Sequence, residues 1–206
     1  MIIGLILLSV NIIFGDLSAK EVLDKVKKSY DSISDASGDF DQVVEYKIAK
    51  LNQQYNGKLS FKKKDKLKIE TDEQTLETDG ETSWTYSVLN EKVIIDNYDP
   101  ENSELSPSRF FIEFPKDFYI EVIGSDKLNN KKVYVLKLTP KNTDNYIQGM
   151  KLWVDDELWF VRQIQVSDIN GSTTFYKLKN LEINKGLPDS HFKFIPNKNV
   201  EIIDLR

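Results

Sequence analysis

Cysteine is absent from the 206-residue chain, and histidine occurs once, as His191. Without thiols the chain cannot form disulfides, cysteine-ligated zinc sites, iron–sulfur clusters or a thiol nucleophile, and a single imidazole excludes most histidine-based chemistry. The chain also lacks a phosphate-binding glycine-rich loop, a nucleophile elbow and a His-Glu-x-x-His motif. We therefore expect no metal, no cofactor and no catalytic residue, and we assign His191 no role.

An excess of positive charge is also missing. The 28 Lys and Arg residues are outnumbered by 33 Asp and Glu, which leaves a net charge of -5. Such a chain has no general cationic field with which to hold nucleic acid, so we expect no nucleic-acid partner. The 40% apolar and 11% aromatic content is too high for a disordered chain and predicts a globular protein of about one domain.

Long hydrophobic runs are absent after the first residues. Residues 1–14 form an uncharged apolar stretch that is too short to span a bilayer and has the length of a signal-peptide core. We predict a signal peptide over residues 1–15, with cleavage after Gly15 or Ala19, followed by one domain over residues 16–206. Because no basic residue precedes the apolar run, an uncleaved anchor or a misassigned start codon remain alternatives. Export of a cysteine-free chain fits the periplasm.

The mature chain begins with a helix pattern and continues with strand patterns. Ser18 and Glu21 have capping-box spacing, and Val22, Val26 and Tyr30 then recur at helical intervals. Alternating or β-rich segments predict strands over residues 40–48, 55–63, 67–71, 83–88, 92–96, 118–124, 133–139, 147–155, 158–168 and 173–183. A Ser-Pro start predicts a short helix over residues 106–112.

Turn residues between these segments predict how the strands connect. Asp79-Gly80, Asn129-Asn130, Asp155-Asp156 and Asn170-Gly171 are typical of hairpins, so neighbouring strands should be antiparallel. A sheet of about ten such strands twists enough to curl toward a barrel and to enclose a cavity under the helices. The predicted class is therefore mainly β (α+β).

Alternation assigns side chains to faces of the predicted sheet. Phe40, Val44 and Tyr46 share one face of the first strand, and Leu59 and Phe61 share one face of the second. The same alternation places Lys63 on the apolar side, and Trp84 and Tyr86 share a face of a later strand. The basic run over residues 62–68 is interpreted as a solvated hairpin, with a docking patch for an acidic partner as the alternative.

Short motifs occur in an order that resembles the LolA family of periplasmic outer-membrane lipoprotein carriers. They include Gly38-Asp39-Phe40-Asp41-Gln42, Gly57-Lys58-Leu59-Ser60-Phe61, Thr78-Asp79-Gly80 with Trp84-Thr85-Tyr86, Leu138-Thr139-Pro140-Lys141, Met150-Lys151-Leu152-Trp153-Val154-Asp155, Val161-Arg162-Gln163-Ile164, Thr174-Phe175-Tyr176 and Phe192-Lys193-Phe194. The resemblance implies an unclosed antiparallel half-barrel of ten to eleven strands whose lid helices cover a hydrophobic cavity for acyl chains.

The resemblance also implies partners. A carrier of this family receives acylated lipoproteins from an inner-membrane ABC-type releasing transporter and delivers them to an outer-membrane receptor without consuming nucleotide. We expect a non-enzymatic monomer. The alternative is a regulatory module that uses the same half-barrel to sense lipids or lipoproteins.

Candidate site residues follow from the face assignment and the resemblance together. The predicted lining of the cavity comprises Val22, Val26, Tyr30, Phe40, Val44, Tyr46, Leu59, Phe61, Trp84 and Tyr86. Lys63 occupies the position of the family's arginine that bonds the lid helices, and Lys64 that of its proline. Because lysine has fewer donors than arginine and lacks the planar fork, the resemblance implies weaker closure of the lid here.

Overall fold

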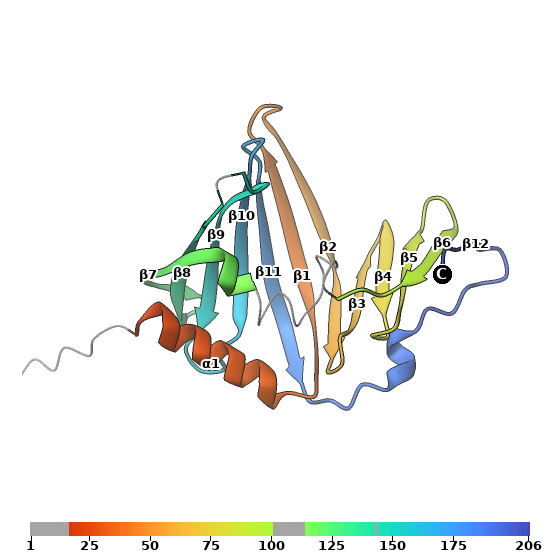
Figure 1. Ribbon diagram of the computed structural model, residues 1–206, viewed down its shortest axis with the longest axis horizontal. Helices are drawn as coiled ribbons and strands as arrows, with labels where there is room; N and C mark the ends of the chain where they lie inside the picture. The colour runs from red at the N-terminus through yellow and green to blue at the C-terminus, as the bar shows by residue number, and fades with distance from the viewer. Residues whose placement is uncertain (1–16, 101–113, 143) are drawn as a thin grey trace, which may run out of the picture.

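The computed structural model describes residues 17–100, 114–142 and 144–206 (Figure 1). Its helices are α1 (Ala19–Ser32), η2 (Phe114–Asp117) and η3 (Asp189–Phe192). Its strands are β1 (Asp35–Tyr46), β2 (Leu51–Lys62), β3 (Lys66–Thr71), β4 (Gln74–Thr78), β5 (Thr82–Ser87), β6 (Lys92–Asn97), β7 (Phe118–Leu128), β8 (Lys131–Pro140), β9 (Ile147–Asp155), β10 (Val161–Asp168), β11 (Thr173–Ile183) and β12 (Glu201–Asp204). The predicted signal peptide and the predicted helix over residues 106–112 lie outside the described residues.

Helix α1 begins where its sequence predicts. The Ser18 hydroxyl accepts the Glu21 amide and the Glu21 carboxylate accepts the Ser18 amide, which completes the capping box. Val22 and Val26, one turn apart, are buried, while most of the remaining helix surface faces solvent. The helix ends at Ser32, and the extended backbone of its C-cap residue Ile33 leads toward β1. No helix among the described residues is long and apolar enough to cross a membrane.

Twelve strands form one unclosed sheet in the order β12-β6-β5-β4-β3-β2-β1-β11-β10-β9-β8-β7. Each chain-adjacent pair is antiparallel from β1 to β6 and from β7 to β11, and the pairing of β1 with β11 joins these two halves. Asn129 and Asn130 both have positive φ, as a tight hairpin turn requires. The mainly β, unclosed antiparallel architecture predicted from the sequence is thus confirmed.

The main errors of the strand prediction concern β1, β4 and β12. Other strand ends are shifted, such as the starts of β2 at Leu51 instead of residue 55 and of β10 at Val161 instead of residue 158. Strand β1 starts at Asp35, before Gly38, because its first residues pair with β11 and the end of β2. Strand β4 was not predicted, because it contains one large apolar residue, Leu76, and therefore lacks a clear alternating pattern. Strand β12 has four residues and pairs in parallel with β6, so no hairpin signal precedes it.

The register divides the sheet into two faces. We call the side that carries α1 the helix face, and the opposite side the outer face. Against the helix face, Val22 and Val26 pack in a buried cluster with residues of β7, β8 and β9, and a second cluster surrounds Phe61 of β2. The apolar core therefore lies between α1 and the sheet.

The chain after β11 covers part of the outer face. We call residues 184–200 the C-terminal strap. It contains η3, in which the Phe192 side chain is fully buried, and Phe194, whose ring lies 5.1 Å from that of Tyr86. The strap ends at β12, which extends the sheet beyond β6.

Candidate functional site

An apolar row crosses the helix face from β2 to β6. Leu59 is in register with Ile69, Ile69 with Leu76, Leu76 with Thr85 and Thr85 with Ile94. Directly opposed residues in antiparallel strands project to the same face, so these five side chains form one continuous surface. Leu59, Ile69 and Leu76 are half-buried, and Ile94 is 39% exposed. Thr85 is exposed and is the one polar member, so the row is mostly apolar and incompletely packed.

Helix α1 covers the other half of the helix face. Figure 1 shows it crossing the end of the sheet on the side of β7 to β11, whereas β3 to β6 lie beyond its last turn. Its buried residues pack with Leu136, Met150 and Leu152 in a closed cluster. Val22 and Val26, predicted to line a cavity, are therefore core residues in this conformation, and they can meet a ligand only if α1 lifts.

Tyr30 and Phe61 mark the boundary between the covered and uncovered halves. Their rings stack with centroids 5.6 Å apart, which links the end of α1 to β2. Burial raises the pKa of Tyr30 to about 12, so its phenol stays neutral over the physiological range. Leu59 and Ile69 pack against the same cluster. The structure therefore brings Tyr30, Leu59 and Phe61 together, as predicted.

Phe40, Val44 and Tyr46 continue the apolar surface along β1. Phe40 is paired with Gly57 of β2, and a Cβ at Gly57 would lie 2.8 Å from the Phe40 ring, so the ring rests on the glycine backbone. Val44 is buried, while Phe40 and Tyr46 are half-buried. The predicted alternation on β1 is correct, and it leads from the apolar row toward the β1–β2 turn.

Trp84 and Tyr86 were predicted for the same lining but lie on the outer face. Trp84 is in register with Glu77, Glu77 with Lys68 and Lys68 with Ser60, which puts Trp84 on the face opposite Phe61. Alternation within β5 showed that the two aromatics share a face, but the face depended on β4, which the sequence pattern did not reveal. Tyr86 accordingly contacts Phe194 of the C-terminal strap.

Lys63 lies at the end of α1 instead of on the apolar surface. Strand β2 ends at Lys62, so the alternation that placed Lys63 inward does not continue to it, and the residue is exposed. Its Nζ donates a hydrogen bond of 2.8 Å to the carbonyl oxygen of Asp31 in the last turn of α1. A cation is favoured there because the final carbonyls of a helix lack intrahelical donors.

Two further contacts hold α1 against the turn between β9 and β10. The Ser29 hydroxyl donates to the Leu158 carbonyl oxygen at 2.6 Å, and the Lys25 ammonium lies 4.5 Å from the centre of the Trp159 ring. Trp159 in turn stacks on Tyr134 at 5.7 Å. The attachments from Lys25 to Asp31 are mostly polar and partly exposed, so they can be exchanged for water at low cost.

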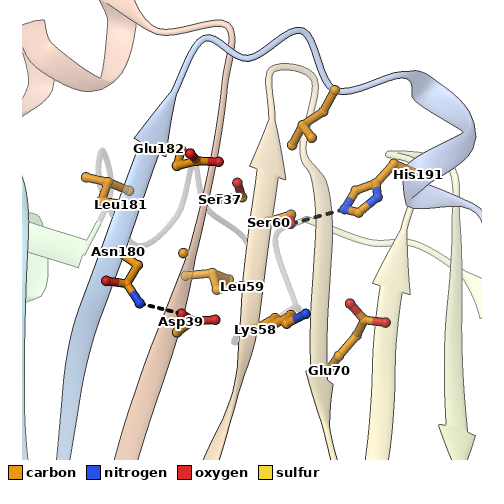
Figure 2. Close-up of a pocket in the computed structure, with 12 residues that line it drawn as sticks. Ser37, Asp39, Lys58, Leu59, Ser60, Glu70, Asn180, Leu181, Glu182 and His191 are labelled. Atoms are coloured by element: carbon orange, nitrogen blue, oxygen red, sulfur yellow. Dashed lines mark hydrogen bonds between the residues drawn. The ribbon is translucent and has the colours of Figure 1, made fainter.

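A separate hollow of about 640 Å³ lies across β1, β2 and β11 (Figure 2). Most of its lining residues are polar, and they include Ser60, whose Oγ lies 3.1 Å from Nε2 of His191. Asn180 donates to Asp39 at 2.7 Å in the same hollow. Because most of these side chains belong to the outer face, the hollow differs from the apolar cavity predicted for acyl chains. No sequence motif had indicated a partner for His191.

The basic run over residues 62–68 is largely neutralised within the chain. Lys62 and Lys66 form ion pairs with Asp189 of the strap at 2.6 and 2.9 Å. Lys68 pairs with the buried Glu77 at 2.8 Å; burial lowers the pKa of Lys68, but Glu77 and Glu70 outweigh burial and raise it. The run therefore anchors the strap and the outer face, which weakens its interpretation as a docking patch for an acidic partner.

Comparison with known proteins gives the same family as the motifs. The family model described as outer membrane lipoprotein carrier protein LolA matches residues 31–195. This chain belongs to the LolA family. An outer-membrane lipoprotein carrier protein of Haemophilus influenzae is 25% identical over 195 residues, which are 93% of this chain and 91% of the relative.

Two further similar proteins are described only as uncharacterised. An uncharacterised protein of Methanocaldococcus jannaschii is 26% identical over 190 residues; these are 91% of this chain but 54% of the relative, so the chain spans about half its length. A crystal structure of an uncharacterised conserved protein from Thermus thermophilus superposes with a TM-score of 0.63 at 12% identity, over 90% of this chain and 98% of that one. This likeness supports the fold.

The ion pairs of Asp189 predict a dependence of stability on pH. Hydrogen bonds from Lys62 and Lys66 lower the pKa of Asp189 from 3.8 to about 2. A carboxyl whose pKa falls on folding stabilises the folded state above its unfolded pKa and loses this contribution as the pH falls through the folded pKa. We expect Asp189→Asn to lower stability at neutral pH and to flatten its loss between about pH 4 and pH 2.

Chemical denaturation across this pH range measures the effect. Asp72→Asn, at an exposed position in the β3–β4 turn, is the control and should keep the wild-type slope. Equal slopes for all three proteins would show that Asp189 does not hold the strap.

Proposed function

We propose that the protein is a periplasmic carrier that shields the acyl chains of lipoproteins on the helix face. It takes them from an inner-membrane ABC-type releasing transporter and delivers them toward an outer-membrane receptor, with no catalytic step of its own. Membership of the LolA family supports lipoprotein as cargo. The observation that carries the proposal is the incompletely packed row from Leu59 to Ile94, in which every side chain except Thr85 is apolar and which adjoins the apolar side of β1.

The physical need for a shield is large. Three acyl chains contain about 45 methylene groups, and at roughly 0.8 kcal/mol each their exposure to water costs on the order of 35 kcal/mol. Free diffusion of such a molecule between membranes is therefore negligible. An apolar surface of the carrier recovers much of this cost by replacing water around the chains.

Release requires that shielding is not too favourable. A carrier that bound the chains more tightly than the receiving membrane would retain its cargo. The polar attachments of α1 supply a competing state: when α1 is closed, Lys63 bonds Asp31 and Tyr30 stacks on Phe61. If loading lifts the end of α1, these contacts re-form when the cargo departs and favour the empty carrier.

Neighbouring residues of β4 test where the acyl chains bind. Leu76 lies on the helix face and Thr75 on the outer face, and both are half-buried. We expect Leu76→Asp to weaken binding of a synthetic triacylated lipopeptide by about tenfold or more, because a charge replaces apolar contact area. Thr75→Asp is the matched control and should bind like the wild type.

Fluorescence titration of the purified proteins gives the affinities, and thermal unfolding confirms that both variants fold. Equal loss in both variants, or loss only in Thr75→Asp, would contradict a site on the helix face.

Lys63 tests the closing contact. We expect Lys63→Leu to bind lipopeptide at least as tightly as the wild type but to release it several-fold more slowly to acceptor vesicles, because the empty state loses its bond to Asp31. Lys63→Arg should transfer at the wild-type rate or faster, since arginine keeps the charge and adds donors. Lys64→Leu, at the exposed neighbouring position, is the control.

Release is followed by stopped-flow fluorescence of a labelled lipopeptide. Wild-type rates and retention in Lys63→Leu would mean that this bond closes α1 without influencing cargo release.

A further inference from the structure

Four exposed apolar side chains gather at the end of the sheet opposite α1. Ile48 and Leu51 belong to the β1–β2 turn and the start of β2, Tyr146 precedes β9, and Ile169 lies in the β10–β11 turn; their exposed fractions are 86%, 51%, 60% and 60%. We call these four residues the tip patch. Figure 1 shows the β1–β2 and β10–β11 turns side by side, with α1 at the other end of the strands.

Contacts among the turns show that the residues of the tip patch lie on adjoining turns. A Cβ at Gly171 in the β10–β11 turn would lie 3.8 Å from Cδ of Lys47 in the β1–β2 turn. The Ile169 amide donates to the Tyr146 carbonyl oxygen at 2.9 Å, and the Tyr146 hydroxyl donates to Asp168 at 3.1 Å. Single exposed apolar residues are common on protein surfaces, but several on adjoining turns are typical of a contact surface.

We propose that the tip patch docks the carrier onto the surface of a lipid bilayer that contains anionic lipid. Lys47 and Lys50 flank Ile48, and both are exposed. Lysines beside an apolar side chain suit the bilayer interface, because their stems remain in apolar surroundings while the ammonium groups reach lipid phosphates. Tyr146 adds an aromatic ring with a polar end, which is also favoured at this depth.

The position of the tip patch relates docking to cargo transfer, and this step rests on the proposed function. Leu51 is in register with Tyr46, and Val44 and Phe40 follow on the same side of β1. Leu51 therefore links the tip patch to the helix face along this side of β1, on which Gln42 is the one polar residue between Phe40 and Tyr46. Docking by this end would let an acyl chain pass between bilayer and helix face with little exposure to water.

Flotation with vesicles of phosphatidylcholine and phosphatidylglycerol tests the docking of the cargo-free protein. We expect the wild type to float with the vesicles, and Ile48→Asp/Ile169→Asp to reduce the bound fraction by about tenfold or more, because each change places a charge in the bilayer interface. Ile195→Asp is the control: Ile195 is 79% exposed but lies on the C-terminal strap, so its replacement should leave flotation unchanged.

Lys47→Glu/Lys50→Glu isolates the electrostatic part. This variant should bind vesicles that contain phosphatidylglycerol more weakly than the wild type, and the difference should shrink in high salt. If this variant and the wild type bound these vesicles equally at low and at high salt, the lysines would not contribute to docking, and the preference for anionic lipid would be overturned.

Lipopeptide binding without vesicles, measured on the same proteins, separates the two proposals. We call Ile48→Asp/Ile169→Asp the tip variant. If it binds lipopeptide normally but does not float with vesicles, the result supports docking by the patch. Failure of the wild type to float, or equal flotation of the tip variant, overturns the docking proposal while normal lipopeptide binding leaves the carrier function standing. A tip variant that loses only self-association, measured by light scattering, would identify a second copy of the chain as the occupant and would also overturn it.

Discussion

One helix is too short to cover the apolar face of this sheet. The 14 residues of α1 extend about 21 Å at roughly 1.5 Å each. Twelve strands at about 4.8 Å spacing span roughly 53 Å before the sheet curves. Among the described elements, α1 closes the half of the helix face formed by β7 to β10, and the apolar row on β2 to β6 is left incompletely packed. The proposed acyl-binding surface follows from this mismatch.

In the described part of the chain, the outer face is partly covered by the C-terminal strap and not by an α-helix. The C-terminal strap lies across it, buries Phe192, and connects through Asp189 to Lys62 and Lys66. Polar pairs such as Lys68 with Glu77 occupy the face beneath the strap, together with the buried Trp84. The two sides of one sheet therefore differ in chemistry: the outer face is held by ion pairs and the strap, while the helix face keeps apolar area available.

Local patterns were sufficient for most of the fold. The capping box at Ser18, the hairpin dipeptides and the alternation of β1 depend on neighbours in sequence, and each was predicted correctly. The face of Trp84 was not, because it depends on register carried across β3 and β4 and a one-residue change reverses it. The inward placement of Lys63 was also wrong, since β2 ends one residue earlier. The bond of its ammonium to α1 is nevertheless the contact that the family resemblance implied. The pairing of His191 with Ser60 joins residues far apart in the chain and has no local signal.

The central claim is that acyl chains lie on the helix face of β2 to β6. Methyl-labelled protein titrated with a lipopeptide that carries a nitroxide at the end of an acyl chain tests this claim most directly. We expect paramagnetic broadening of the methyl signals of Leu59, Ile69 and Leu76, and unchanged signals from the buried Val133 and Val135, which are not part of the apolar row. Broadening of the methyl signals of Leu181 and Leu187, which line the outer-face hollow, with Ile69 and Leu76 unaffected, would contradict the account.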